Sequence, residues 1–133
     1  MRCNLVGGNM PYKIRWTETG VEVQFSGIFD FETNKNANCE IYEDPRTDSI
    51  NYAIWDASGV WSALATKAEF SIFAMQDKAG SLRLPSLKLA MLAKDTEILN
   101  LFEYYANYCN AQIPGWNVMV FDSMDKVRSW ISS

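Results

Sequence analysis

Histidine is absent from all 133 residues of this chain. Histidine is the side chain that most often titrates near neutral pH and one of the commonest ligands of zinc and iron. Its absence also excludes serine–histidine and cysteine–histidine nucleophilic catalysis. We therefore expect a protein that is not an enzyme, with no catalytic residue, no bound metal and no cofactor.

Cysteine is scarce and poorly spaced for pairing. The chain carries Cys3, Cys39 and Cys109, an odd number with long spacings and no C-x-x-C motif. This arrangement argues against a disulfide framework and favours a reducing compartment, so we expect a cytoplasmic protein. Cys109 should be a small buried side chain, and Cys39 an unreactive thiol with no clear basic neighbour.

Long apolar runs and basic clusters are missing as well. No stretch approaches the roughly 20 apolar residues of a membrane-spanning helix, so no membrane span is expected. Residues 1–9 lack the apolar segment of a signal peptide and are expected to form a flexible extension before a single domain over residues 10–133. The net charge is −4 and the twelve Lys and Arg residues are scattered, which argues against a nucleic-acid partner.

What the sequence does contain is an alternation of strand and helix patterns. Strands are expected at residues 12–16, 21–25, 52–55, 87–92 and 116–121, and the first two should form a hairpin around Thr19-Gly20. Helices are expected over residues 30–43, from either Trp61 or Thr66 to Gly80, along an apolar stripe from Ile98 to Cys109, and after Ser123. This ββαβαβαβα order predicts an α/β fold with a mixed, mostly parallel five-stranded sheet and about four helices.

Three short motifs accompany that order. They are Phe25-Ser26-Gly27 after the hairpin, Asp44-Pro45-Arg46 followed by Tyr52-Ala53-Ile54-Trp55-Asp56, and Val118-Met119-Val120-Phe121-Asp122 before a helix that ends in Trp130-Ile131. Together they resemble bacterial members of the STAS group, the SpoIIAA-like or anti-sigma-factor-antagonist-like superfamily, over about residues 11–132. The resemblance implies the SpoIIAA-like fold and a regulatory role through protein contacts.

The resemblance also implies a kinase partner and a phosphorylated serine in an Asp-Ser-Ser-Gly-type turn that enters the helix after the third strand. Asp56-Ala57-Ser58-Gly59 looks similar to that turn. By strand register, however, the regulatory position falls near Ala65, with Ser62 and Thr66 as neighbours. The chain therefore departs from the family pattern at the residue that carries the switch.

Polar residues follow three of the expected strands. Asp56 and Ser58 come after the third strand, Lys94 after the fourth and Asp122 after the fifth. Ligands of open α/β sheets bind at the carboxyl ends of the strands, so these four residues form a candidate polar pocket. The alternative is a structural role in which Asp56 holds a turn or pairs with Lys94.

The second helix has apolar residues on two sides. On a helical wheel Phe70 lies nearly opposite one apolar face and Phe73 is well removed from it. A helix that is apolar on two sides is covered by its own chain or by a partner, so Phe70 and Phe73 are a candidate interface. The alternative is that the first helix or the N-terminal extension covers them. The apolar face opposite Phe70 comprises Leu64, Ala65, Ala68, Ile72 and Met75.

Three functions remain open from these patterns. The favoured one is a non-enzymatic regulatory or scaffolding domain with a protein partner, which could be a second copy in a homodimer. The second is a binder of a small or apolar, lipid-like ligand in a cavity lined by the surplus aromatic residues. The third and least favoured is an enzyme that uses carboxylates and Lys94. The aromatic residues in question are Trp55, Trp61, Trp116, Tyr104 and Tyr108.

Overall fold

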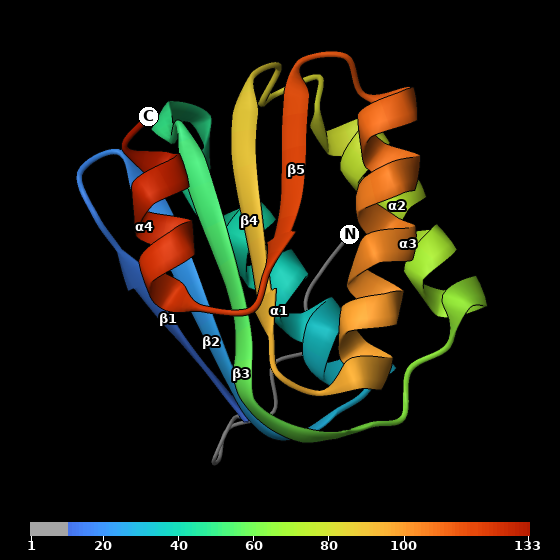
Figure 1. The fold of residues 1–133 in the computed structure, drawn as a ribbon. Helices are drawn as coiled ribbons and strands as arrows, with labels where there is room; N and C mark the ends of the chain where they lie inside the picture. The colour runs from blue at the N-terminus through green and yellow to red at the C-terminus, as the bar shows by residue number, and fades with distance from the viewer. Residues whose placement is uncertain (1–10) are drawn as a thin grey trace.

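The computed structural model describes residues 11–133, and the predicted extension at residues 1–9 lies outside them. The element order is the predicted ββαβαβαβα, which confirms the α/β fold class (Figure 1). The strands are β1 (Tyr12–Trp16), β2 (Gly20–Phe29), β3 (Tyr52–Ala63), β4 (Leu87–Ala93) and β5 (Trp116–Phe121). The helices are α1 (Phe31–Glu43), α2 (Lys67–Gly80), α3 (Thr96–Gln112) and α4 (Met124–Ile131), with a 3₁₀ turn η1 at Pro45–Ser49.

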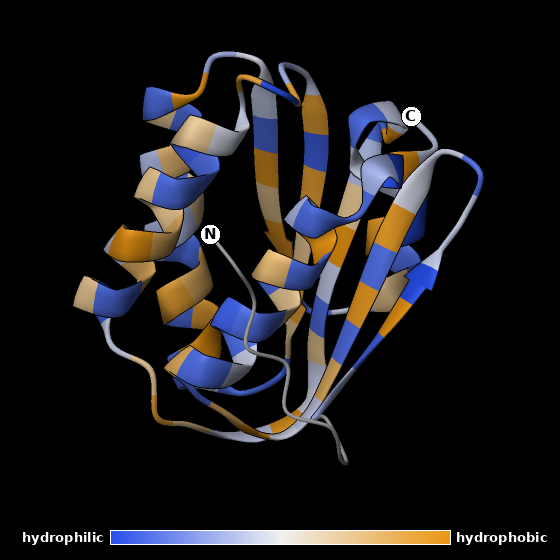
Figure 2. Cartoon of the chain, turned by 180° about the vertical axis from the view of Figure 1, so that it is seen from behind, coloured by the Kyte–Doolittle hydropathy of each residue, from blue (hydrophilic) through white to orange (hydrophobic). Residues whose placement is uncertain are grey.

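The five strands form one mixed sheet in the order β1-β2-β3-β4-β5. β1 and β2 pair antiparallel as the predicted hairpin, and every other neighbouring pair is parallel. Hydrophobic and hydrophilic residues alternate along the hairpin strands, as expected when only one face is fully covered (Figure 2). β4 is instead apolar along nearly its whole length, because it is an inner strand of the sheet with helices packed on both faces.

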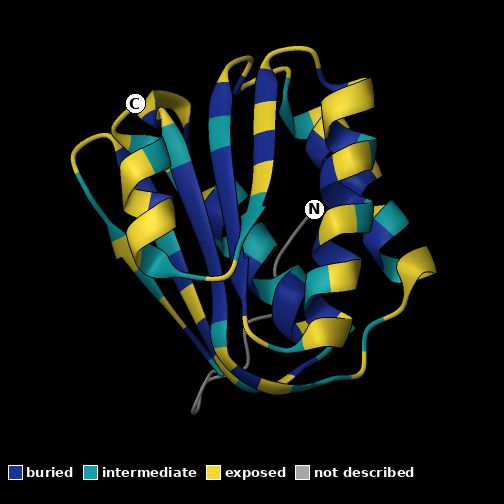
Figure 3. Cartoon of the chain, viewed as in Figure 1, coloured by how far each residue is buried: buried dark blue, intermediate teal, exposed yellow. Residues whose placement is uncertain are grey.

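Three helices cover one face of the sheet and one helix covers part of the other (Figure 1). α1, α2 and α3 bury the larger core, which is rich in aromatic side chains such as Phe25, Phe29 and Phe102. α4 packs on the opposite face, where Val127 contacts Ile54 and neighbouring side chains of β4. Figure 3 shows the resulting pattern, with buried residues along β3 and β4 and exposed residues on the outer sides of α3 and α4.

Each helix begins at a side-chain cap, which explains why these segments start where they do. Thr66 forms a capping box with Glu69, so α2 begins at the later of the two predicted starts. Asp95 and Ser123 cap α3 and α4, and Asp30 caps α1. The caps satisfy backbone N–H groups that the first turn of a helix leaves without partners.

β2 and β3 are longer than the sequence predicted. Gly27 has a φ of 77°, and the pairing between the strands shifts register twice on either side of it. Glycine tolerates this conformation, so the strand continues through Ser26-Gly27 instead of ending there. β1 pairs only as far as Phe25, and β4 pairs only as far as Ala57. Residues 27–29 of β2 and 60–63 of β3 therefore pair only with each other, and we call them the β2–β3 extension.

The two outer edges of the sheet carry features that hinder the addition of another strand. On β5 the side-chain amide of Asn110 donates to the carbonyl oxygen of Val118 at 2.9 Å and accepts from the N–H of Val118 at 2.8 Å. Asn110 thus takes the place of a neighbouring strand. On β1 the exposed side chains are Lys13 and Arg15, and charged edge residues oppose edge-to-edge pairing.

Within residues 11–133 we find no helix with both the length and the apolar character that a membrane crossing requires. This agrees with the absence of long apolar runs noted above.

We predict that Asn110→Ala destabilises the fold by about 1–2 kcal/mol and promotes self-association through β5, because two hydrogen bonds and the cover of the edge are lost. The free energy of unfolding in urea and the sedimentation profile measure both effects. Asn107→Ala, an exposed asparagine on the same helix, is the matched control and should change neither. Equal behaviour of the two variants would contradict the role given to Asn110.

Candidate functional site

Three of the four residues predicted at the carboxyl edge, Asp56, Ser58 and Asp122, have hydrogen-bond partners within the chain. Asp56 lies inside β3 and not after it, opposite Leu92 of β4. Its carboxylate accepts hydrogen bonds from the N–H of Ser58 at 2.9 Å and from the Ser58 hydroxyl at 2.6 Å. Asp56 therefore holds the irregular backbone where the β2–β3 extension begins.

Asp122 and Lys94 do lie near one another at this edge. Asp122 forms an exposed ion pair with Lys126 at 2.9 Å, and this hydrogen bond lowers the pKa of the Asp122 carboxyl, with a smaller contribution from the charge of Lys94. Two cavities among the described residues lie instead on the face of the sheet that α1, α2 and α3 cover. A ligand pocket at the carboxyl edge stays a prediction.

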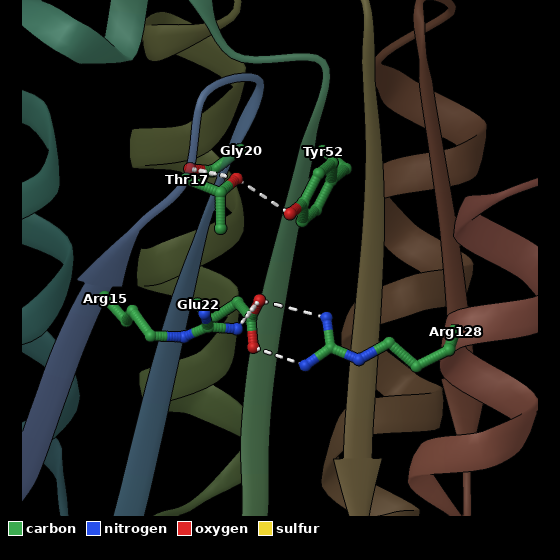
Figure 4. Close-up of polar contacts among 6 residues, drawn as sticks. All are labelled: Arg15, Thr17, Gly20, Glu22, Tyr52 and Arg128. Atoms are coloured by element: carbon green, nitrogen blue, oxygen red, sulfur yellow. Dashed lines mark hydrogen bonds and ion pairs between the residues drawn. The ribbon is translucent and has the colours of Figure 1, made fainter.

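A charged cluster on the α4 face has no signal in the local sequence (Figure 4). Both oxygens of the Glu22 carboxylate accept from the guanidinium of Arg128, at 2.7 and 2.9 Å, and Arg15 donates to the same carboxylate. The hydrogen bond from Arg128 is the main cause of a lowered pKa of Glu22. The cluster joins α4 to the hairpin, so its first role is to hold this short helix on the sheet.

The large core encloses a cavity of about 50 Å³ between the sheet and the helices α1, α2 and α3. Its walls are mostly apolar, and Trp55 and Trp116 are among them, as the ligand hypothesis expected. The indole N–H of each donates to a protein oxygen, Asn34 Oδ1 and the Leu84 carbonyl respectively. Trp61, in contrast, is exposed and lies elsewhere, on β3.

One carboxylate faces this cavity, that of Asp77 on α2. The hydroxyl of Tyr42 on α1 donates to Asp77 Oδ1 at 2.8 Å, and the hydroxyl of Tyr105 on α3 donates to Oδ2. The side chain of Asn38 donates to Asp77 as well. The carboxylate thus connects the helices α1, α2 and α3 through hydrogen bonds.

Burial controls the charge of this cluster. Loss of solvent raises the pKa of Asp77 to about 6, although the bonds from Tyr105, Tyr42 and Asn38 act in the opposite direction. Burial, together with the charge of Asp77, raises the pKa of both tyrosines above their usual range. Asp77 is therefore the group that titrates closest to neutral pH in this cavity.

Phe70 and Phe73 are not an interface. Each is 2 % exposed, and both pack within the α1–α3 core, so the prediction that they form a docking face is wrong. They share the inner face of α2 with Ala74 and Asp77 at the spacing i, i+3, i+4, i+7. The charged residue in that stripe hid it from pattern analysis, and Asp77 was missed for the same reason. The outer side of α2 instead exposes Ile72 and Met75.

The cysteines differ from the expectation in one respect. Cys109 is free and buried on α3 as predicted, and burial raises its pKa to about 12, which makes it a poor nucleophile. Cys39 is disulfide-bonded, so the expectation of a thiol there is wrong. The compartment expected from the cysteine pattern stays a prediction. Among residues 11–133, no group of three or more acidic or cysteine side chains could hold a metal ion.

The β2–β3 extension is the second notable feature. Phe29 and Val60 are buried in the core, whereas Ile28 and Trp61 are exposed. The register shift between Gly27 and Ile28 leaves Trp61 without a paired residue on β2. Trp61 is 70 % exposed, and Leu64 just beyond the strand is 65 % exposed. Three of the seven exposed large apolar side chains among the described residues, Ile28, Trp61 and Leu64, thus lie at the part of the sheet that lacks neighbouring strands.

No family model, curated protein or solved structure matches this chain. The resemblance to the STAS group stays a prediction.

We predict that the Asp77 carboxyl makes folding less favourable as pH rises. Its folded pKa of about 6 exceeds the ordinary 3.8, so the penalty is absent below pH 3.8, grows from there to pH 6 and then stays constant. Two pKa units correspond to about 3 kcal/mol. Asp77→Asn should remove this component, so the free energy of unfolding of the variant relative to the natural chain should increase over that interval.

The measurement is urea unfolding at a series of pH values, with Glu103→Gln on the exposed side of α3 as the control. The control should keep the pH profile of the natural chain. If the free energy of unfolding of Asp77→Asn changes with pH in parallel with that of the natural chain, then folding does not raise the pKa of Asp77.

Proposed function

We propose that this domain is a non-enzymatic protein-binding module and that its working surface is the open side of the β2–β3 extension. The observation that carries the proposal is Trp61, the most exposed of the aromatic side chains in the core-forming strands, beside exposed Ile28 and Leu64. Tryptophan is strongly enriched at the energetic centres of protein interfaces.

The geometry of the extension supports a polypeptide as the partner. Parallel strands occur almost only where both faces of a sheet are covered, and a ribbon of two strands has little stability alone. Here two parallel strands continue beyond their neighbours with one face open. A partner that covers this face would give the extension the burial that the rest of the sheet already has.

We take the partner to be a second copy of this chain. The exposed patch is uncharged and apolar, and an apolar patch can be complementary to itself across a two-fold axis. β1 and β5 are the alternative routes to association, and charged residues or Asn110 hinder strand addition at both. A regulatory or scaffolding role in the STAS manner fits such an assembly and belongs to the same proposal.

A lipid-like ligand is less well supported. Ligand pockets usually enclose about 300–1,000 Å³. The internal cavity has about 50 Å³, which is too small for an acyl chain. An enzymatic role for Lys94 and the carboxylates has no further support, because Asp56 is bonded to Ser58 and Asp122 is paired with Lys126.

We predict that replacing both Trp61 and Leu64 by serine abolishes self-association and changes the free energy of unfolding by less than about 0.5 kcal/mol, because both side chains are exposed. Sedimentation velocity over about a hundredfold range of concentration measures the monomer–dimer equilibrium. Leu82→Ser is the matched control, since Leu82 is 89 % exposed after α2, outside the extension.

The natural chain and the Leu82→Ser variant should both shift from monomer to dimer as concentration rises. If the natural chain sediments as a monomer throughout, the second copy is not the partner. If the double variant still dimerises, the contact lies at another surface.

A further inference from the structure

Asp77 has no cationic partner among the described residues. None of the five ion pairs in residues 11–133 includes it, and its hydrogen-bond donors are the neutral groups of Tyr42, Tyr105 and Asn38. A carboxylate can accept about four hydrogen bonds, so these three donors leave capacity for another. A buried negative charge without a counterion is costly, and a positively charged ligand would offset that cost.

The walls of the same cavity are aromatic. Six rings line it, and they come from both the sheet and the helices. The face of an aromatic ring attracts a cation, and Trp and Tyr do so best. Recognition of alkylammonium ions by an aromatic cage with a nearby carboxylate follows this chemistry. The rings belong to Tyr42, Trp55, Phe70, Phe73, Tyr105 and Trp116.

The volume limits the size of the guest. One water-sized atom requires roughly 10–15 Å³ when cavities are measured in this way, so 50 Å³ holds about four non-hydrogen atoms. Trimethylammonium has that size. Larger quaternary ions and acyl chains do not fit.

A way in is present on the outer side of the cluster. A groove of about 340 Å³ between α1 and α2 shares Asn38 and Tyr42 with the inner cavity. The Tyr42 hydroxyl bonded to Asp77 lies at the boundary between the two spaces. Rotation of this one side chain would connect the groove to the carboxylate.

We propose that the cavity beside Asp77 is a binding site for a compact alkylammonium cation, which the carboxylate pairs with and the aromatic walls enclose. This site is separate from the β2–β3 extension and does not depend on the proposed self-association.

The pH dependence follows from the groups that face Asp77. Tyr42 on α1 and Tyr105 on α3 stay neutral, and Cys109 on α3 stays a thiol, because burial raises the pKa of each. The charge of Arg83, which follows α2, acts on Tyr42. Asp77 is then the group whose charge changes near pH 6, so cation binding is strong above that pH and weak below it.

The test is a thermal-unfolding titration of the full chain with trimethylammonium chloride, above and below pH 6. Isopropanol, which has the same number of non-hydrogen atoms and no charge, is the matched control. Sodium chloride controls for ionic strength, and tetraethylammonium controls for size. We expect the unfolding temperature to rise with trimethylammonium only above pH 6, and not to rise with the three controls.

Variants make the assignment specific. Asp77→Asn should weaken binding more than about tenfold, whereas Glu103→Gln should leave it unchanged. Ala53→Val, which fills the cavity while it keeps the carboxylate, should also abolish binding. Ligand-observed NMR saturation transfer provides a second readout that does not rest on stability.

Three results would overturn the proposal. The first is the absence of any saturation transfer to trimethylammonium above pH 6, which would mean that the cavity holds water at most. The second is equal stabilisation by isopropanol, which would mean that charge plays no part. The third is undiminished binding in Asp77→Asn, which would place the cation elsewhere. None of these outcomes bears on the dimer contact, because Trp61 lies outside this cavity.

Discussion

A parallel sheet has to be covered on both faces, and the rest of this structure follows from how that requirement is met. Strands β2 to β5 run parallel, so each connection crosses the sheet through a helix. The three connecting helices, α1, α2 and α3, all lie on one face of the sheet, and α4 alone covers the other face. The chain therefore has one deep core, one thinly covered face and one segment, the β2–β3 extension, with an open side.

The thin face combines a small apolar cluster with polar contacts. Val127 is the one fully buried side chain of α4, a helix of eight residues. Glu22 and Arg128 join it to β2, and the Lys88 ammonium on β4 donates to the carbonyl oxygens of Trp130 and Ser133 at the end of the chain. A cation at a helix C-terminus also interacts favourably with the helix dipole. On this face polar contacts thus add to the packing of Phe121, Trp130 and Ile131, whereas the other face has a large core rich in aromatic side chains.

The deep core, in contrast, buries the carboxylate of Asp77 among phenylalanine and tryptophan rings. Asp77 binds donors from both neighbouring helices, so it orients α1 and α3 relative to α2. Apolar residues of similar size could fill that space without the cost of desolvation. A cationic ligand in the small cavity beside Asp77, as proposed above, would offset this cost of desolvation.

Local signals in the sequence determined the order of elements, the helix caps and the fold class, because hydrophobic periodicity and capping act within a few residues. The stripe from Ile98 to Cys109 and the cap at Thr66 are examples. Tertiary structure decided which face of α2 turns inward. Phe70 on that face packs against three aromatic rings from other elements, and these contacts outweigh the burial of one charged residue, Asp77. The three rings belong to Phe29, Phe102 and Tyr105. Tertiary structure also decided how far β2 and β3 continue, through pairing across a bulge at Gly27. The meeting of Tyr42, Asp77 and Tyr105 depends on residues 28 or more positions apart, and no pattern within one element could have revealed it.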